Sequence, residues 1–292
     1  MNLMVTLIRR ELWEHRVLWI APLVAAALLI AVALGGHAQV EVPRDVALDD
    51  RGRLALFALM QWAFVLPQYL LMLIVLFFYL LDCLYAERRD RSILFWKSMP
   101  VSDGQTVASK LLTALLVVPL GVFVLALLAD LVFAAIIGLR FGDASAFVAW
   151  DTRTWLKLQA LMLFGLMIAM LWYAPVAAWL LLISAWARRN LFLWAVLPPV
   201  FAVMLERIAL GTDRIGDFLR YRLFGIWREL GVREGLGDAL RIGGERLPRV
   251  DRLFDVIDAS PVLGDPHLWL GLLFAAALVR VTIRIRRRRD DR

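Results

Sequence analysis

The stretch from Leu70 to Val118, "LLMLIVLFFYLLDCLYAERRDRSILFWKSMPVSDGQTVASKLLTALLVV", places a charged segment between two long apolar runs. An α-helix rises 1.5 Å per residue, so about 20 apolar residues cross the roughly 30 Å hydrocarbon core of a bilayer. The run that ends before the charged segment and the run that follows it both have this length. The stretch therefore predicts two membrane-spanning helices with a polar connection between them.

The rest of the chain repeats this pattern. Its 292 residues are 62% hydrophobic, whereas soluble domains are about 45–50% apolar. The last of the apolar runs is the weakest because Arg280 interrupts it, although Arg280 and Arg284 stand four residues apart and can extend toward the headgroups. We expect an all-α polytopic membrane protein with a single transmembrane domain over residues 1–292. Its six predicted spans are residues 17–35, 59–81, 111–138, 156–186, 191–209 and 265–283.

The distribution of positive charge predicts the orientation of these spans. Once the long segment after the fifth span is set aside, the side that holds both termini carries 17 Lys and Arg residues and the opposite side carries 6. Cytoplasmic segments are enriched in Lys and Arg. We therefore expect a bacterial cytoplasmic (inner) membrane protein with both termini and residues 84–110 in the cytoplasm. Basic residues at the ends of apolar runs also argue against a nucleic-acid partner.

Two further segments have helical patterns outside the spans. Leu3, Leu7, Ile8, Trp13 and Val17 recur near helical spacing, which predicts an amphipathic helix in the headgroup plane or, equally well, an ordinary basic flank. The long extracytoplasmic segment, residues 210–267, is too charged to span and too apolar for a loose linker. Its aromatic and leucine side chains are expected to line one face of a short helix against the outer leaflet or a partner subunit. These are Phe218, Tyr221, Leu223, Phe224 and Trp227.

No motif in the sequence predicts that this chain binds a nucleotide, a metal or another cofactor. The phosphate-binding pattern G-x-x-x-x-G-K-[ST] is absent, and no pair of Cys or His residues has zinc-ligand spacing. The single thiol, Cys83, cannot form an internal disulfide. If ATP drives this protein, another chain has to bind the ATP, so we do not expect an enzyme.

Polar side chains within the apolar runs are candidates for a pathway or an interface, since they are costly in lipid. Asp130 is the only carboxylate well inside such a run, and Gln61 and Gln68 lie along the second span. A lone carboxylate lacks the second group of an acid-base pair. A hydrogen bond between helices is therefore the simpler explanation for Asp130, and interior packing for the two glutamines.

The connection between the second and third spans predicts a rigid corner. A helical pattern runs from Leu84 to Met99, and Pro100 ends it. Ser102 with Gln105 three residues later is a capping-box pattern, which starts a helix that continues into the third span. The arginines and the Phe95–Trp96 pair are typical of a protein interface, but also of a connector that lies in the headgroups.

This connection resembles the cytoplasmic loop that follows the second span in permeases of the ABC type-2 transporter family. The family pattern is an E-R-x-x-x-[ST]-[IL] stretch, a [ST]-[LM]-P-[VL]-S turn and a lysine that opens the third span. The matching residues here are Glu87, Arg88, Ser92, Ile93, Ser98, Met99, Pro100, Val101, Ser102 and Lys110. The match covers about 28 residues, from Tyr85 to Leu112, and the six-span plan is similar over nearly the whole chain.

The resemblance implies that this chain is the permease subunit of an ATP-driven exporter. Residues 84–110 would then be the coupling loop that docks on a separate ABC ATP-binding subunit, which holds ATP and Mg. The residues expected to carry coupling are Glu87, Arg88, Arg89, Ser92, Phe95, Trp96, Pro100, Ser102 and Lys110. The family also implies a second permease copy in a homodimer, with membrane lipids around it.

The sequence alone also leaves two other functional classes of protein open. One is an intramembrane enzyme that acts on a lipid or peptide, with Asp130 as its acid or base. The other is a membrane scaffold or immunity protein that binds a partner and moves no substrate. The length of the segment at residues 210–267, greater than in many permeases of that family, sets this chain apart.

Overall fold

The computed structural model describes residues 3–35, 50–90, 101–141, 152–229 and 263–289, without the side chains at some helix ends. All regular elements in these residues are helical. They are α1 (Leu3–Glu14), α2 (Val17–Gly35), α3 (Asp50–Arg89), α5 (Asp103–Leu112), the π-helix η1 (Thr113–Val117), α6 (Val118–Phe141), α8 (Thr152–Trp186), α9 (Leu191–Leu210), α10 (Arg214–Glu229) and α14 (Pro266–Arg289).

Several of these helices are long and apolar enough to cross a membrane. Within the described ranges there are five, with spans at Val65–Arg89, Asp103–Phe133, Trp155–Trp186, Leu191–Leu210 and Pro266–Arg288. A sixth is obtained when α1 and α2, which meet at a 60° bend, are taken as one broken span. The helical multi-pass membrane protein expected from the sequence is therefore confirmed, and the six-span layout stays a prediction.

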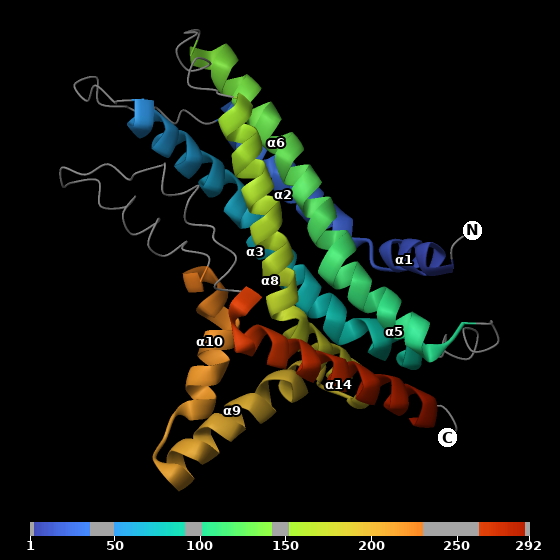
Figure 1. Cartoon of the computed structure of the whole chain (residues 1–292). Coiled ribbons are helices and arrows are strands. Elements are labelled where there is room, and N and C mark those ends of the chain that lie inside the picture. The colour runs from blue at the N-terminus through green and yellow to red at the C-terminus, as the bar shows by residue number, and fades with distance from the viewer. Residues whose placement is uncertain (1–2, 36–49, 91–100, 142–151, 230–262, 290–292) are drawn as a thin grey trace.

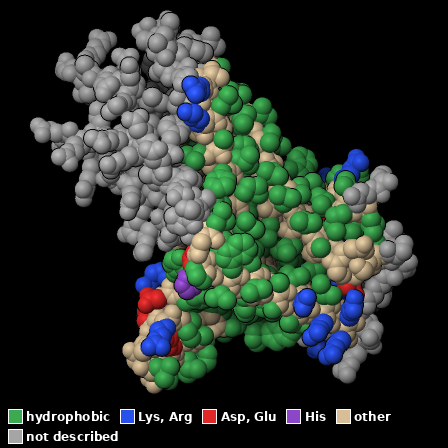
Figure 2. Space-filling model, in the orientation of Figure 1, with side chains coloured by type: hydrophobic (Ala, Val, Ile, Leu, Met, Phe, Trp, Pro, Cys, Tyr) green, Lys and Arg blue, Asp and Glu red, His purple; other side chains and the backbone are tan. Residues whose placement is uncertain are grey.

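The core lies between α3, α8 and the continuous helix formed by α5, η1 and α6 (Figure 1). α2 packs against α3 and α6, while α8 packs against α3 on one side and α14 on another. Buried aliphatic side chains such as Met72, Leu84 and Leu181 fill the contacts. Figure 2 shows that the outer surface of the helices is also largely hydrophobic, as expected for a bundle whose solvent is lipid.

The predicted capping box at the start of α5 is confirmed. Ser102 Oγ accepts a hydrogen bond from the Gln105 backbone N–H at 3.2 Å, and Gln105 Oε1 accepts one from the Ser102 N–H at 2.9 Å. These two bonds satisfy donors that the first turn of a helix otherwise leaves unpaired. The cap fixes where the chain turns back toward the bundle.

We expect the substitution Ser102→Ala to lower the free energy of unfolding by about 1 kcal/mol, since this is the usual cost of losing an N-cap. Ser102→Thr keeps the hydroxyl and should retain most of the stability. Unfolding in mixed micelles measures both variants. Equal stability of the alanine and threonine variants would show that the cap contributes nothing.

The helix that follows widens by one π-turn, η1, which begins three residues after Lys110. Thr113 Oγ1 donates to the Ser109 carbonyl at 2.8 Å within this region. Pro119 offers no backbone N–H, and in a regular α-helix its ring would clash with the carbonyl four residues earlier, that of Leu115. The widening lies over that same turn, so we assign its cause to Pro119.

Helices α9 and α10 form a hairpin that projects from the bundle (Figure 1). Gly211, with φ of +63°, ends α9. The Glu206 carboxylate then accepts the backbone N–H groups of Arg214 and Ile215 at 2.8 and 2.6 Å, which caps α10. An Arg207 hydrogen bond to Asp213 keeps the pKa of Asp213 below its ordinary value. The hairpin turn is thus held by side chains from both helices.

The helix α10 docks on α8 and on the start of α14. Trp172 Nε1 donates to the Arg222 carbonyl at 2.8 Å, and the Arg222 guanidinium lies 4.8 Å from the Trp172 ring centroid. Tyr221 OH donates to Asp265 at 2.8 Å. Burial lowers the pKa of Arg222. A Cβ on Gly271 would meet Arg222 Nη2 at 2.0 Å, so a larger residue at this position requires the Arg222 guanidinium to move.

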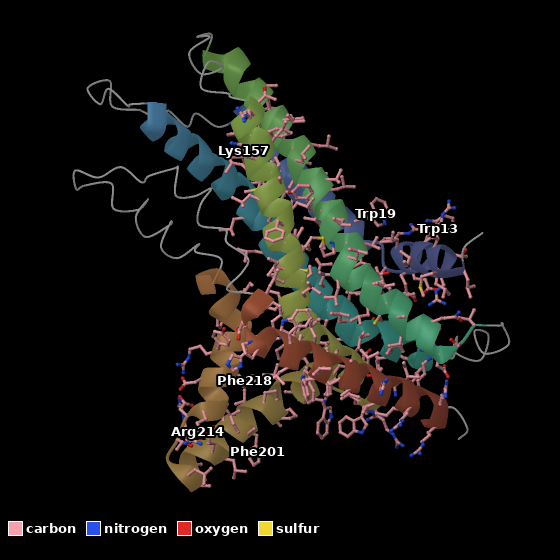
Figure 3. The ribbon with its side chains drawn as sticks, viewed as in Figure 1. Trp13, Trp19, Lys157, Phe201, Arg214 and Phe218 are labelled. Carbon is pink, nitrogen blue, oxygen red and sulfur yellow. The ribbon has the colours of Figure 1, made fainter. Side chains whose placement is uncertain are left out.

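The helix expected in the extracytoplasmic segment is therefore present as α10, but its aromatic residues do not share one face. Tyr221 points inward, whereas Phe218 and Phe224 are exposed, and Figure 3 shows Phe218 on the hairpin with Phe201 of α9. The reason is helical phase, since at 100° per residue Phe218 and Phe224 lie about 120° apart around α10. The Trp227 side chain lies outside the described residues.

Candidate functional site

A fully buried lysine lies at the point where α5 approaches the bundle. Lys110 is 0% exposed, and its Nζ lies 2.8 and 2.9 Å from the two carboxylate oxygens of Glu11 and 3.0 Å from Glu87 Oε1. Glu11 comes from α1 and Glu87 from the last turn of α3. One ammonium group therefore joins three helices.

Two arginines complete the cluster. Arg10 Nη2 lies 2.6 Å from Glu11 Oε1 and 3.0 Å from Glu87 Oε1. Arg286, near the end of α14, donates from Nη1 to Glu87 Oε2 at 2.8 Å and from Nε to Asp103 Oδ1 at 3.0 Å. We call Arg10, Glu11, Glu87, Asp103, Lys110 and Arg286 the corner network. Its three acids and three bases are formally neutral together.

The corner network satisfies the condition under which buried charges are tolerated. Taking a charge out of water is costly unless ion pairs and hydrogen bonds replace the water. Glu11 has a further donor in Tyr79 OH, at 3.0 Å. The partners come from four separate helices, α1, α3, α5 and α14, with up to 199 residues between two bonded side chains. The network therefore fixes these four helices relative to one another.

A second contact fastens the end of α3 to the end of α8. Arg88 Nη2 donates to the backbone carbonyls of Ser184 and Ala187 at 2.5 and 2.9 Å. These carbonyls belong to the last turn of α8 and the residue after it, where a helix leaves acceptors unpaired. Ser184 Oγ in turn accepts from the backbone N–H groups of Leu84 and Tyr85, both at 3.1 Å.

The residues expected to carry coupling divide into three groups. Glu87 and Lys110 are buried in the corner network and Arg88 is bonded to α8, so their side chains have partners within the chain. Arg89 is 55% exposed and pairs with Asp90, and Ser102 is the exposed cap of α5. Ser92, Phe95, Trp96 and Pro100 lie outside the described residues.

Asp130 makes the hydrogen bonds between helices that the simpler interpretation predicts. The carboxylate is buried, and its Oδ2 accepts from Trp155 Nε1 at 2.8 Å and from Gln159 Nε2 at 3.2 Å, both on α8. Asp130 follows Lys110 by 20 residues in the same continuous helix, a rise of about 30 Å. The two polar clusters are thus separated by about the thickness of a hydrocarbon core.

Of the two glutamines in the second predicted span, the structure describes the side chain of Gln68 and not that of Gln61. Gln68 is fully buried, and neither its amide oxygen nor its amide nitrogen has a hydrogen-bond partner among the residues described. Gln61 lies in α3, but its side chain is outside the described residues. Gln68 is therefore the candidate pathway residue with unused hydrogen-bonding capacity.

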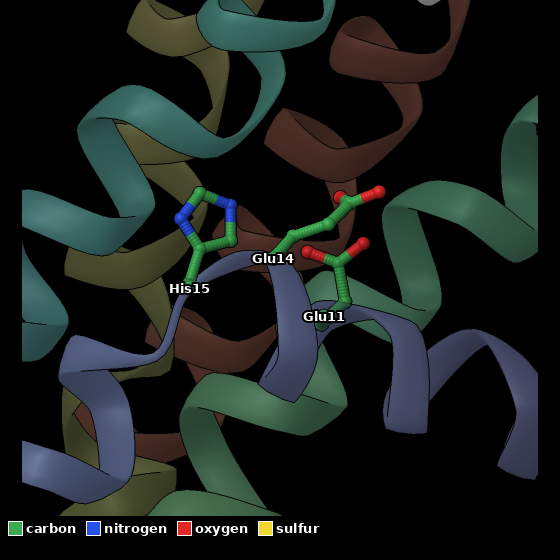
Figure 4. Close-up of side chains that lie close together, drawn as sticks. All are labelled: Glu11, Glu14 and His15. Carbon is green, nitrogen blue, oxygen red and sulfur yellow. The ribbon is translucent and has the colours of Figure 1, made fainter.

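Glu11, Glu14 and His15 also lie close together, with one potential ligand atom of each within 4.8 Å of the others (Figure 4). Metal ions favour carboxylates that are free to coordinate. Both oxygens of Glu11 are already engaged, by Lys110, Arg10 and Tyr79. We therefore assign Glu11 to the corner network rather than to a metal site.

Sequence reasoning did not bring Arg10, Glu11, Asp103 and Arg286 into the site. A signal was present for Glu11, because it follows Leu7 by four residues and so continues the apolar stripe of α1. A carboxylate on the buried face of a helix requires a cation opposite it. Lys110, which follows the buried positions Thr106 and Val107 by one helical turn, is the matching signal.

No family model, no curated protein and no solved structure matches this chain. The fold defines the class as a helical multi-pass membrane protein.

Proposed function

We propose that this chain is the permease subunit of an ATP-driven exporter of the ABC type-2 kind, which works with a separate ATP-binding subunit and a second permease copy. The proposal rests on the resemblance of residues 85–112 to the coupling loop of that family. It is supported by a geometry that suits transmission of force from such a loop to the membrane helices. ATP and Mg would be bound by the partner subunit, on the cytoplasmic side.

The structural observation that supports the proposal is that both ends of the connection are fastened to the same network. In the sequence, residues 91–100 connect α3 to α5. Glu87 lies four residues before this connection and Asp103 lies three residues after it. Glu87 and Asp103 both hold Arg286 of α14, and Glu87 also holds Lys110 and Arg10. A push on this connection would move α3 and α5 together with α1 and α14.

In this scheme the coupling residues have two roles. Glu87, Arg88 and Lys110 are positioning residues that make the corner rigid from inside. Contact with the ATP-binding subunit is assigned to Arg89, Ser92, Phe95 and Trp96, with Pro100 and Ser102 setting the direction of the turn. Gln68 and Gln61 are proposed to line the path, while the hydrogen bonds of Asp130 favour a role in holding α6 to α8.

The test is co-purification with the ATP-binding protein encoded near this chain, followed by ATPase measurement in liposomes. We expect Arg89→Glu with Trp96→Ala to reduce permease-stimulated ATP hydrolysis at least severalfold without loss of folded permease. Arg89 is the suitable arginine to reverse, because reversal of Arg88 would also break its bonds to α8.

Arg214→Glu is the matched control, since Arg214 is exposed at the first turn of α10, where a carboxylate is compatible with the helix dipole. Its ATPase stimulation should equal that of the wild type. Full stimulation by the Arg89/Trp96 variant would contradict the coupling assignment. Absence of any co-purifying ATPase would instead favour the scaffold class.

A further inference from the structure

The last two turns of α14 carry exposed arginines on one face. Arg280, Arg284, Arg287 and Arg288 are all exposed, Arg287 to 69%. At 100° per residue these four positions fall within an arc of about 100°. Arg286 falls on the opposite side, where it enters the corner network. Figure 2 shows basic side chains gathered where α14 ends.

Among the described residues, little negative charge lies close to this arginine stripe. Arg287 Nε lies 3.9 Å from Asp103 Oδ2, and the other oxygen of this carboxylate, Oδ1, accepts from Arg286. The other three make no ion pair with any residue that the structure describes. The buried Arg286 is therefore held by two carboxylates, whereas the exposed stripe has only a distant contact with one of them.

The stripe continues a face that suits contact with lipid. Trp269, Leu270 and Leu273 lie on the same side of α14 and are 56, 62 and 69% exposed. Their apolar side chains need a hydrocarbon environment, whereas the arginines follow toward the C-terminal end. From Arg280 to Arg288 the helix rises about 12 Å. This rise exceeds one headgroup layer, which is about 5–8 Å thick on each side of the roughly 30 Å hydrocarbon core, so the stripe crosses that layer and reaches the water.

The arginine stripe lies at the same end of the bundle as the start of α5. Arg286 bonds to Asp103, and Ile283 approaches Gly104, so the last turns of α14 lie beside the start of α5. The start of α5 precedes the apolar run that follows Lys110, so it lies at the end of that membrane span. The arginines therefore lie at one membrane face, beside the corner network.

We propose that Arg280, Arg284, Arg287 and Arg288 form a binding surface for the headgroups of anionic phospholipids in the leaflet beside the corner network. Guanidinium groups bind phosphate oxygens in bidentate geometry, and helix-end arginines close to the membrane attract anionic lipid. Bound lipid on this face would hold the same helical turns whose other face carries Arg286. The inference depends on membrane insertion and does not depend on the proposed transport function.

The experiment uses the full chain in nanodiscs of phosphatidylcholine, with and without an equal part of phosphatidylglycerol. Lipid retained after mild extraction is counted by native mass spectrometry, and the thermal midpoint is measured in both discs. For the wild type we expect retained phosphatidylglycerol and a higher midpoint in the anionic discs. The variant R280Q/R284Q/R287Q/R288Q should lose most of the retained lipid and the difference in midpoint.

Two further variants make the outcome specific. R188Q/R189Q removes exposed arginines from the turn between α8 and α9 and should keep lipid retention unchanged. Replacement of the four stripe residues by lysine preserves the charge and should keep most of the lipid retention. This variant separates loss of binding from loss of folding. Inorganic phosphate at the same ionic strength should not displace the lipid.

Unchanged retention in the glutamine variant would overturn the proposal, as would an equal loss in R188Q/R189Q. If the glutamine variant kept its phosphatidylglycerol and lost a co-purifying protein, the stripe would instead be a protein contact. Transport or ATPase activity enters none of these readouts, so failure here leaves the proposed function untouched.

Discussion

Replacement of Lys110 by methionine should lower the free energy of unfolding by about 3–5 kcal/mol, the usual cost of leaving a buried charge without its partner. Lys110 is 0% exposed and neutralises two carboxylates, Glu11 and Glu87. Methionine has a similar shape, so little packing is lost and the effect reports on charge. The measurement is unfolding in mixed micelles under reversible conditions.

Lys157→Met is the matched control, because Lys157 is exposed at the far end of α8 (Figure 3). Surface substitutions usually change stability by no more than about 0.5 kcal/mol. The double variant Lys110→Met with Glu11→Gln should recover part of the loss, since one uncompensated carboxylate is removed. A Lys110 variant as stable as the Lys157 variant would contradict the assignment of Lys110 to a buried ionic network.

Replacement of Trp172 by alanine should also lower the free energy of unfolding by about 3–5 kcal/mol, as for other buried tryptophans cut back to alanine. Trp172 is fully buried, donates to the Arg222 carbonyl and lies beneath the Arg222 guanidinium. Its loss leaves that guanidinium without its aromatic partner. We expect faster amide exchange in α10 in addition to the lower stability.

Trp13→Ala provides the comparison for this prediction, because Trp13 is 68% exposed on α1 (Figure 3). That variant should lose far less stability and leave exchange in α10 unchanged. If Trp172→Ala destabilised the protein while α10 kept its wild-type exchange, α10 would be held by other contacts than those described.

The helices of this protein are predictable from the sequence because apolar length is a strong signal in a membrane. The Ser102–Gln105 cap is equally local, and its geometry follows from two residues three apart. The helical pattern that begins at Leu84 also predicts the charged last turns of α3, which ends at Arg89, while residues 91–99 of that pattern lie outside the described residues. The partners of these turns are different, because Arg88 bonds to α8 and Glu87 to α14, about 100 and 200 residues away along the chain.

The corner network was not predictable as a cluster for the same reason. Arg286 stands within a run of arginines, and composition alone does not tell which of them points inward. Helical phase distinguishes them. Arg286 follows the buried Thr282 by four residues and so lies on the same face of the helix, whereas Arg284 and Arg287 lie on other faces. The π-turn after Lys110 likewise depends on how Pro119 is accommodated within a packed helix, which pattern matching does not reveal.

The central claim is that the corner network makes α1, α5 and the ends of α3 and α14 one mechanical unit. The most direct measurement is amide hydrogen exchange of the full chain in nanodiscs, wild type against Lys110→Met. We predict that exchange rises together in residues 3–14, 84–90 and 280–288, although these segments are far apart in sequence. A rise confined to residues 103–117, with α1 and the end of α14 unchanged, would contradict the claim.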